Sequence, residues 1–299
     1  MSATPPPFLR LGLTGYPIAH SLSPLLHLAA LRAASLPGEY RLYPVPPLPQ
    51  GEGQLRALLE GLRAPAAIRL HGLNVTIPHK QVVLALLDDL TRTARAVGAV
   101  NTLWFADGLL MGENTDVAGF WQDFEQCLRL DGWDAAPAAA LLIGAGGAAR
   151  AVAYALISHG WQVALAARRL PQARRLADDL NHLGLPGEVI PLRLNAGSLA
   201  NWRHARALIN ATPLGMAACP QDCPYPSELP LPENALVYDL VYHPPETPLL
   251  RRARAQSLRG FNGLGMLIEQ ARLAFVCWSG FIPPREALWK AIQKPEGER

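Results

Sequence analysis

Residues 144–150 read Gly-Ala-Gly-Gly-Ala-Ala-Arg, and they give the clearest indication of how the second half of the chain folds. They fit the pattern G-x-G-x-x-A. Its first glycine allows a tight turn, its second lets the backbone approach a pyrophosphate, and its alanine lets a helix lie close to its strand. The apolar run 138–143 predicts the strand before such a loop, and the run 151–159 predicts the helix after it. The combination predicts a dinucleotide-binding α/β unit.

The next predicted strand, residues 162–167, completes a βαβ unit and is followed by Arg168 and Arg169. An acidic side chain at this place would hold the ribose 2′-hydroxyl of NAD. No carboxylate is present there, and two guanidinium groups suit a 2′-phosphate instead. These residues therefore predict NADP as the cofactor. Arg174 and Arg175, further along the following helix, are expected to face solvent.

Strands and helices are predicted to alternate along most of the chain, which indicates parallel βαβ units. In the first half, strands are predicted at 8–14, 40–45 and 68–75, and helices at 25–34 and 53–62. Asp107-Gly108 predicts a hairpin turn. In the second half, further strands are predicted at 207–210 and 236–241, and helices at 247–256 and 267–278.

Residues 74–80 read Asn-Val-Thr-Ile-Pro-His-Lys and follow the third predicted strand. Pro78 is predicted to open a helix, because its missing N–H would have no partner in a first turn. Asn74, Thr76 and Lys80 would then gather at a strand end, where ligands bind in α/β sheets. Lys80 is one of three lysines in a chain that otherwise uses arginine. A lysine, unlike an arginine, can be tuned to release its proton near neutral pH. The alternative is a surface lysine at a helix start.

Two other predicted helix starts carry polar side chains. Ser23 is predicted to cap a helix with Pro24 at its first position, and Ser21 lies two residues earlier. Two hydroxyls beside helix N–H groups form a ready site for a carboxylate, although capping alone would explain Ser23. Thr115 is predicted to cap a later helix, and Asp116 is equally well explained as an acidic residue in a first turn.

The composition limits the classes of function. A length of 299 residues suits one large or two ordinary domains, and 50% hydrophobic with 17% charged residues indicates a sizeable core and argues against disorder. The formal charge is only +3, and no wide basic face with interleaved aromatics is present, so nucleic acid is not an expected partner. The N-terminus lacks signal-peptide features and no apolar run reaches membrane-spanning length. A small anionic ligand fits this charge better.

The four cysteines do not predict a metal site. Only Cys219 and Cys223 are close in the sequence, and no second pair accompanies them, so zinc is not expected. Reduced thiols in a cytoplasmic protein are the default expectation for such a chain.

Eight motifs together resemble the shikimate dehydrogenase family, in the family's order and over roughly residues 8–290. They lie at residues 21–24, 74–80, 98–102, 114–116, 144–150, 210–212, 238–242 and 263–266. The resemblance implies a two-domain α/β fold with a cleft between the domains. A discontinuous substrate-binding catalytic domain would span 8–115 and be completed by 262–292. A Rossmann-type NADP-binding domain would span 116–261.

The resemblance also implies a reaction and a set of site residues. The reaction is the NADP-dependent, reversible reduction of 3-dehydroshikimate to shikimate, in chorismate and aromatic amino acid biosynthesis. No metal is implied, and a homodimer is left open. Lys80 and Asp116 would form the catalytic pair. Substrate would be bound by Ser21, Ser23, Asn74, Thr76, Asn101, Asp116, Tyr242 and Gln270. The cofactor would be bound by Gly144, Ala145, Gly146, Gly147, Ala148, Arg168, Arg169, Thr212, Leu240 and Gly263.

Some residues depart from the family pattern. The family's usual Asn-Arg-Thr near the adenosine ribose is Ala167-Arg168-Arg169 here, and a further arginine of that loop corresponds to Gln172. Arg168 is expected to face the 2′-phosphate, with Arg169 replacing the missing contacts. Arg92 occupies a position where family members often have an acidic residue.

Two rival functions stay open. A quinate or dual quinate/shikimate dehydrogenase of the same family, often using NAD, would differ at few residues, although the missing acid after residue 167 argues against NAD. A non-catalytic NADP-binding sensor on the same fold could lose Lys80 or Asp116, and both are present.

Overall fold

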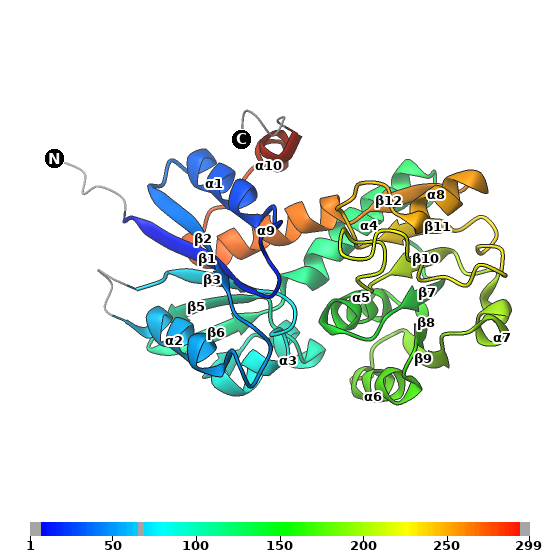
Figure 1. Cartoon of the computed structure of the whole chain (residues 1–299), viewed down its shortest axis with the longest axis horizontal. Coiled ribbons are helices and arrows are strands. Elements are labelled where there is room, and N and C mark those ends of the chain that lie inside the picture. Colours follow the sequence, from blue (N-terminus) through cyan, green and yellow to red (C-terminus); the bar gives the residue numbers. More distant parts are fainter. Residues whose placement is uncertain (1–6, 65–68, 294–299) are drawn as a thin grey trace. The chain divides into compact units, whose positions relative to one another are not determined.

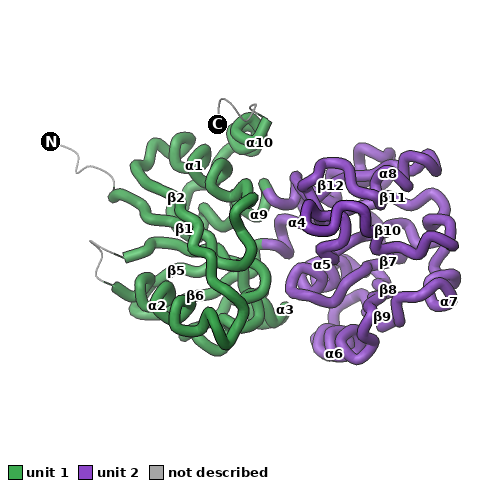
Figure 2. The backbone as a smooth tube through the Cα atoms, in the orientation of Figure 1, with its two compact units in different colours: residues 1–115, 268–299 green, residues 116–267 purple. Residues whose placement is uncertain are grey.

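The computed structural model describes residues 7–64 and 69–293, and the chain divides into two compact units (Figures 1 and 2). Unit 1 comprises residues 1–115 and 268–299, and unit 2 comprises residues 116–267. The chain enters unit 2 at the start of helix α4 (Thr115–Leu130) and leaves it near the start of helix α9 (Leu264–Ser279).

Unit 2 contains a parallel sheet of six strands among its described residues, in the order β12-β11-β10-β7-β8-β9. Counted within the unit, this is the doubly wound order 3-2-1-4-5-6 of dinucleotide-binding folds, which confirms the predicted Rossmann-type architecture. The strands are β7 (Ala139–Ile143), β8 (Gln162–Ala167), β9 (Glu188–Arg193), β10 (Ala207–Asn210), β11 (Leu236–Asp239) and β12 (Gly260–Asn262).

Both faces of this sheet are buried. Alternate strand residues such as Leu142 and Leu165 pack with α4, α5 and α6, while their neighbours Leu141 and Ala164 pack with residues of α7 and α8. The period of two follows from the pleat of a strand, which sends successive side chains to opposite faces. The helices are α5 (Gly147–Ser158), α6 (Leu170–Asn181), α7 (Ala196–Leu199) and α8 (Pro248–Ala255), with the 3-10 turn η2 (Ala200–Trp202).

Unit 1 contains a mixed sheet in the order β2-β1-β3-β5-β6-β4. The expected parallel pairing holds for β1 with β2 and β3, but β5 runs antiparallel to β3 and to β6. Asp107 (φ 51°) and Gly108 (φ 80°) form the predicted hairpin turn between β5 and β6. The strands are β1 (Leu9–Gly15), β2 (Gly38–Pro44), β3 (Gly72–Val75), β4 (Asp89–Leu90), β5 (Thr102–Ala106) and β6 (Leu109–Glu113).

Two predicted helix starts in unit 1 are wrong. Helix α1 (Ser23–Ala33) already includes Ser23, and its N-cap is Leu22, which makes no side-chain capping bond. Pro78 lies in a turn after a cis peptide bond with Ile77 and opens no helix. The other helices are α2 (Glu52–Arg63), the 3-10 helix η1 (Val82–Leu86), α3 (Arg92–Val97), most of α9, and α10 (Arg285–Gln293).

One edge of the unit 1 sheet collects the ends of four strands. Because β1, β3 and β6 run in one direction and β5 runs opposite, the carboxyl ends of the first three lie beside the amino end of β5. Residues that follow β1, β3 and β6, and those that precede β5, therefore share this edge. These are the segments that hold the predicted polar side chains.

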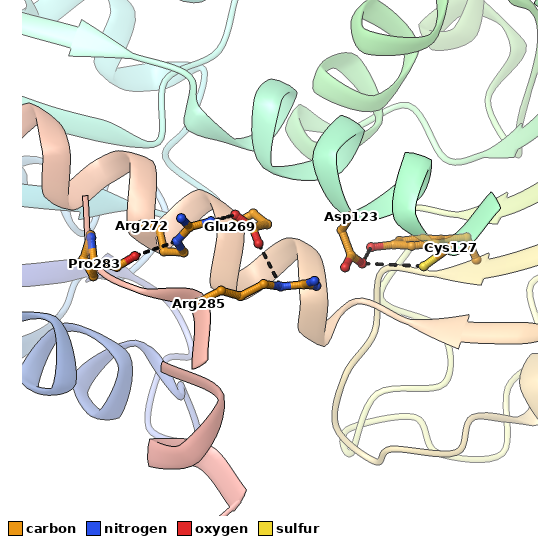
Figure 3. A network of polar contacts seen from close by, with 7 residues as sticks. Asp123, Cys127, Glu269, Arg272, Pro283 and Arg285 are labelled. Atoms are coloured by element: carbon orange, nitrogen blue, oxygen red, sulfur yellow. Dashed lines mark hydrogen bonds and ion pairs between the residues drawn. The ribbon is translucent and has the colours of Figure 1, made fainter. Parts of the chain in front are cut away.

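A buried carboxylate fixes α9 within unit 1 (Figure 3). Glu269 lies on α9 and forms ion pairs with Arg272 of the same helix and with Arg285 at the start of α10, the latter at 2.9 Å. Arg272 also donates from Nε to the Pro283 carbonyl at 2.8 Å. These contacts tie α9, which carries Gln270, to the loop before α10.

Candidate functional site

Asn74, at the end of β3, is held in one orientation by its neighbours. Tyr40 donates its hydroxyl to Asn74 Oδ1 at 2.7 Å, and Asn74 Nδ2 donates to the Asn101 carbonyl at 3.1 Å. A second donation from Nδ2 reaches Thr102 Oγ1 at 3.3 Å. A main-chain carbonyl can only accept, so the amide cannot be reversed without losing this bond. Asn74 therefore presents its carbonyl oxygen on the side of Tyr40.

Asn101, just before β5, is hydrogen-bonded to residues of three elements. Its Oδ1 accepts from the Thr115 N–H at 2.8 Å and from Thr102 Oγ1 at 3.0 Å. Its Nδ2 donates to Thr115 Oγ1 at 2.9 Å and to Gln270 Oε1 at 3.4 Å. The network thus connects the start of β5, the residue that begins α4, and α9.

The two serines occupy the start of α1. The Ser23 N–H donates to Ser21 Oγ at 3.2 Å, and the Ser21 hydroxyl donates to Ser23 Oγ at 3.1 Å. Ser21 therefore accepts the first N–H of α1, that of Ser23, whereas within the described residues Ser23 caps no later N–H of the helix. Ser23 also lies against Tyr40: burial raises the pKa of Tyr40 well above its usual value, and the Ser23 hydroxyl acts in the opposite direction. The serines consequently adjoin the polar network.

The remaining predicted residues of unit 1 lie at the same sheet edge. Thr76 packs its methyl group against Gly15, where an added Cβ would lie 2.3 Å from Thr76 Cγ2. The Lys80 carbonyl accepts from the Val100 N–H at 2.7 Å, which places Lys80 opposite the residue before Asn101. In sum, the structure joins Ser21, Ser23, Asn74, Asn101 and Gln270 into one region of unit 1, with Thr76 and Lys80 at its edge. Asp116 and Tyr242 belong to unit 2; Asp116 is buried and directly follows Thr115.

His27 is a buried residue of this region that the sequence did not single out. Its ring stacks on Tyr40 with centroids 4.5 Å apart and planes at 6°, and lies 5.0 Å from the Trp278 ring. Burial lowers the pKa of His27 from 6.5 to about 3, while the nearby Asn74 amide acts in the opposite direction. A neutral imidazole thus supports the tyrosine that orients Asn74. The repeat of apolar positions on α1 gave no sign of this role.

His27 is expected to make the protein less stable in acid. Below pH 6.5 the unfolded chain takes up a proton on His27 that the folded protein does not take up. The free energy of unfolding is therefore highest above pH 6.5 and decreases as the pH falls from 6.5 toward 3. Between pH 7 and pH 5 the loss should be on the order of 2 kcal/mol. His27→Phe keeps a stacked ring without a titrating group, so its urea midpoint should fall less over this range. The exposed His182→Gln serves as control, and an equal acid loss in wild type and His27→Phe would contradict the assignment.

The glycine loop of unit 2, residues 144–148, has a backbone that suits a pyrophosphate. Gly144 adopts φ 115°, a conformation that side chains rarely allow, and an added Cβ there would lie 2.9 Å from the Ala211 carbonyl oxygen. At Gly146 an added Cβ would meet nothing within 4 Å, so open space lies beside the N-terminus of α5. Helix N–H groups facing open space favour a bound phosphate. These residues fit the predicted cofactor.

A second buried network holds the ends of β10 and β11. Asn210 Oδ1 accepts from the N–H and the hydroxyl of Thr212 at 2.9 and 2.7 Å. Asn210 Nδ2 donates to Asp239 Oδ1 at 2.8 Å, and Thr247 donates its hydroxyl to Asp239 Oδ2 at 2.6 Å. Burial raises the pKa of Asp239 to about 6, against the effect of these donors. The network fixes Thr212 and the segment that begins at Leu240.

Close packing explains two glycines at the start of α9. An added Cβ at Gly263 would lie 2.1 Å from the Leu240 carbonyl oxygen, and one at Gly265 would lie 1.9 Å from Asp123 Oδ1. Asp123 is itself fixed, because the buried Tyr238 hydroxyl donates to it at 2.7 Å. The resemblance assigned Gly263 to the cofactor site, and the structure supplies a packing reason for both glycines.

Arg168 and Arg169 follow β8, as predicted, and both are exposed. Tyr242 is partly buried and lies beyond β11. Within residues 7–64 and 69–293, no group of three or more His, Cys, Asp or Glu side chains is placed to hold a metal ion. In the same residues, no helix combines the length and apolar character needed to cross a membrane.

Two family descriptions match parts of the chain. One, "Shikimate dehydrogenase substrate binding domain", matches residues 13–103. The other, "Shikimate 5'-dehydrogenase C-terminal domain", matches residues 263–293.

Proteins from several organisms resemble the chain over nearly its whole length. A shikimate dehydrogenase (NADP(+)) of Salinibacter ruber is 42% identical, over 94% of this chain and 95% of that protein. A Thermus thermophilus shikimate 5-dehydrogenase, solved with NADP(H) and shikimate, is 38% identical with a TM-score of 0.78, covering 95% of this chain and 98% of that one. A Corynebacterium glutamicum quinate dehydrogenase, solved with NAD, is 33% identical with a TM-score of 0.82, covering 95% and 98%.

Proposed function

Since the chain belongs to the shikimate dehydrogenase family, we propose that it catalyses the reversible, NADP-dependent reduction of 3-dehydroshikimate to shikimate. The observation that carries this proposal is the hydrogen-bonded network of Asn74, Asn101 and Gln270 at one edge of the unit 1 sheet. Such a network suits a ring with several hydroxyl groups, and the two serines at a helix start suit its carboxylate. The reaction belongs to chorismate and aromatic amino acid biosynthesis.

The orientation of the amides gives each a role toward the substrate. Asn74 turns its carbonyl oxygen toward Tyr40, so it would accept a hydrogen bond from a ring hydroxyl. Gln270 accepts from Asn101 through Oε1, so its Nε2 is the donor end. Thr76, Asn101 and Asp116 complete the proposed hydroxyl contacts. Ser21, Ser23 and Tyr242 would hold the carboxylate.

The proton transfer is assigned to Lys80 and Asp116. Bound NADPH would supply the hydride. As the ketone becomes an alcohol, negative charge builds on its oxygen, which requires a proton and a positive neighbour. The Lys80 ammonium provides both. Asp116 would orient the Lys80 amine and accept from an adjacent substrate hydroxyl.

The two units would have different roles in the reaction. Substrate binding and catalysis are assigned to residues 8–115 with 262–292, and NADP binding to 116–261. The glycine loop, Gly144 to Ala148, would hold the pyrophosphate, supported by the conformation of Gly144 and the open space at Gly146. Thr212, Leu240 and Gly263 would lie toward the nicotinamide, and Arg168 and Arg169 toward the 2′-phosphate.

A quinate dehydrogenase using NAD is the second candidate, because the C. glutamicum enzyme is similar over nearly the full length. Initial rates with shikimate and quinate, each with NADP and NAD, separate the candidates. Shikimate with NADP is expected to give the highest kcat/KM. Activity with quinate and NAD alone would overturn the proposal, and no activity in any pairing would favour a non-catalytic NADP-binding sensor.

The proposal includes a cytoplasmic location. Reduced thiols are the default in the cytoplasm, which agrees with the four free cysteines. A monomer and a homodimer are both compatible with the proposed chemistry, and sedimentation velocity distinguishes them.

A further inference from the structure

A short bridge of hydrogen bonds connects the first turn of α6 to the glycine loop in unit 2. Arg169 Nη2 donates to Gln172 Oε1 at 3.0 Å, and Gln172 Nε2 donates to the Ala145 carbonyl at 3.0 Å. Gln172 therefore uses both ends of its amide. It holds the guanidinium of Arg169 at a defined place beside the loop that follows β7.

This bridge lies where the adenosine ribose of a dinucleotide would reach. β7 and β8 are adjacent in the sheet, and the glycine loop follows β7 while Arg168 and Arg169 follow β8. In a doubly wound fold, the group at the end of the second strand contacts the ribose 2′ position. Both arginines are exposed here, and the segment contains no carboxylate to receive a 2′-hydroxyl.

We propose that Gln172 is a positioning residue that sets the preference for a 2′-phosphorylated dinucleotide by fixing Arg169, so that Arg168 and Arg169 both bind the 2′-phosphate. The inference rests on the proposed NADP-dependent function. An amide suits this task because it holds one guanidinium N–H without adding charge, which leaves the other donors for a phosphate. Without the bridge, Arg169 would have to lose its rotamer freedom when the cofactor binds, which weakens binding.

The test compares kcat/KM for NADP with kcat/KM for NAD. In Gln172→Ala the ratio should fall about 3- to 10-fold, the scale of one lost hydrogen bond. In Gln172→Glu it should fall further, because a carboxylate would pair with Arg169 and repel the phosphate. In Arg169→Ala it should fall roughly 10- to 100-fold, the scale of a charge-assisted bond. General damage to the fold would affect both cofactors and leave this ratio unchanged.

A double variant tests whether Gln172 acts through Arg169. In an Arg169→Ala background, adding Gln172→Ala should leave the ratio unchanged, because the group that Gln172 positions is already gone. Arg174→Ala removes an exposed arginine from the same helix and should also leave the ratio unchanged. A fall with Arg174→Ala as large as with Arg169→Ala would mean that only net charge matters, which overturns the inference.

Binding without turnover gives an independent readout. Calorimetry with adenosine 2′,5′-bisphosphate and adenosine 5′-monophosphate should show the bisphosphate losing affinity in Gln172→Ala while the monophosphate does not. Suppose that wild type binds the bisphosphate and uses NADP, but Gln172→Ala changes neither the NADP-to-NAD ratio of kcat/KM nor the bisphosphate-to-monophosphate ratio of affinities. The inference then fails and the proposed function stands. If wild type uses neither cofactor and binds neither nucleotide, the proposed function itself fails.

Discussion

Replacing Lys80 with alanine should lower the turnover number at least ~100-fold, the usual scale for loss of a general acid–base group. The alcohol oxygen would then form without a nearby proton or positive charge, while the polar network of Asn74, Asn101 and Gln270 would stay intact. Shikimate binding should therefore change much less than turnover. The measurements are kcat in the direction of shikimate oxidation and the dissociation constant of shikimate by calorimetry.

Two further variants make this test sharper. Lys80→Arg keeps a positive charge but cannot release its proton near neutral pH, so it should also stay far below wild type. Lys290→Ala removes an exposed lysine of α10 and should leave turnover unchanged. Near-normal turnover of Lys80→Ala would remove Lys80 from the catalytic pair. Full turnover of Lys80→Arg would reduce its role to charge alone.

The elements around the glycine loop could be predicted closely from the sequence. β8 (Gln162–Ala167) and β10 (Ala207–Asn210) have the predicted ends. Strands of a parallel sheet are buried on both faces, so they read as continuous apolar runs that stop where the sheet stops. For these two strands, the local sequence and the tertiary environment place the strand ends at the same residues.

Helix starts were predicted less well, because the same residues also suit turns. A serine can accept an N–H in a cap or in a turn, and here Ser21, not Ser23, accepts an N–H at the start of α1. Pro78 suits a first helical turn or a turn of its own. Around it, the Tyr16 N–H donates to the Ile77 carbonyl and the buried His79 bonds the Val45 carbonyl at 2.8 Å. Those distant partners, invisible in the local sequence, determine the backbone.

Candidate site residues could be proposed from the sequence, but their hydrogen-bond partners could not. Tyr40 and Asn74 are 34 positions apart, and Asn101 and Gln270 are 169 apart. Neither separation follows from a helical or strand period. Gln172 was noted only as a substitution within a known pattern, and its bridge to Ala145 depends on the adjacency of β7 and β8. Side-chain motifs thus supplied the proposed site residues, whereas the fold supplied their hydrogen-bond partners.

Replacing Gly263 with alanine should destabilise unit 2 by roughly 2–4 kcal/mol, in the upper range for overpacking. The added Cβ would lie 2.1 Å from the Leu240 carbonyl oxygen and 2.6 Å from its carbon, which are main-chain atoms that no rotamer change can move. Leu240 is in turn held by its N–H donation to the Asn210 carbonyl at 2.9 Å, and Asn210 is bonded to Asp239. The measurement is the urea unfolding midpoint without any cofactor.

Gly197 provides the matched control, because an added Cβ in α7 of the same unit would meet only Asn195 Oδ1 at an ordinary 3.7 Å. Gly197→Ala should leave the midpoint unchanged or raise it, since alanine favours a helix over glycine. Gly263→Ala should lose stability even without NADP, and its NADP affinity should fall as the segment after β11 shifts. If the midpoint stays at the wild-type value while NADP affinity falls, the glycine serves the cofactor rather than the packing. That outcome would show that the main chain at residue 263 can move away from the Leu240 carbonyl at little cost in stability. It would contradict the expectation that both main-chain segments are fixed by their hydrogen bonds and packing.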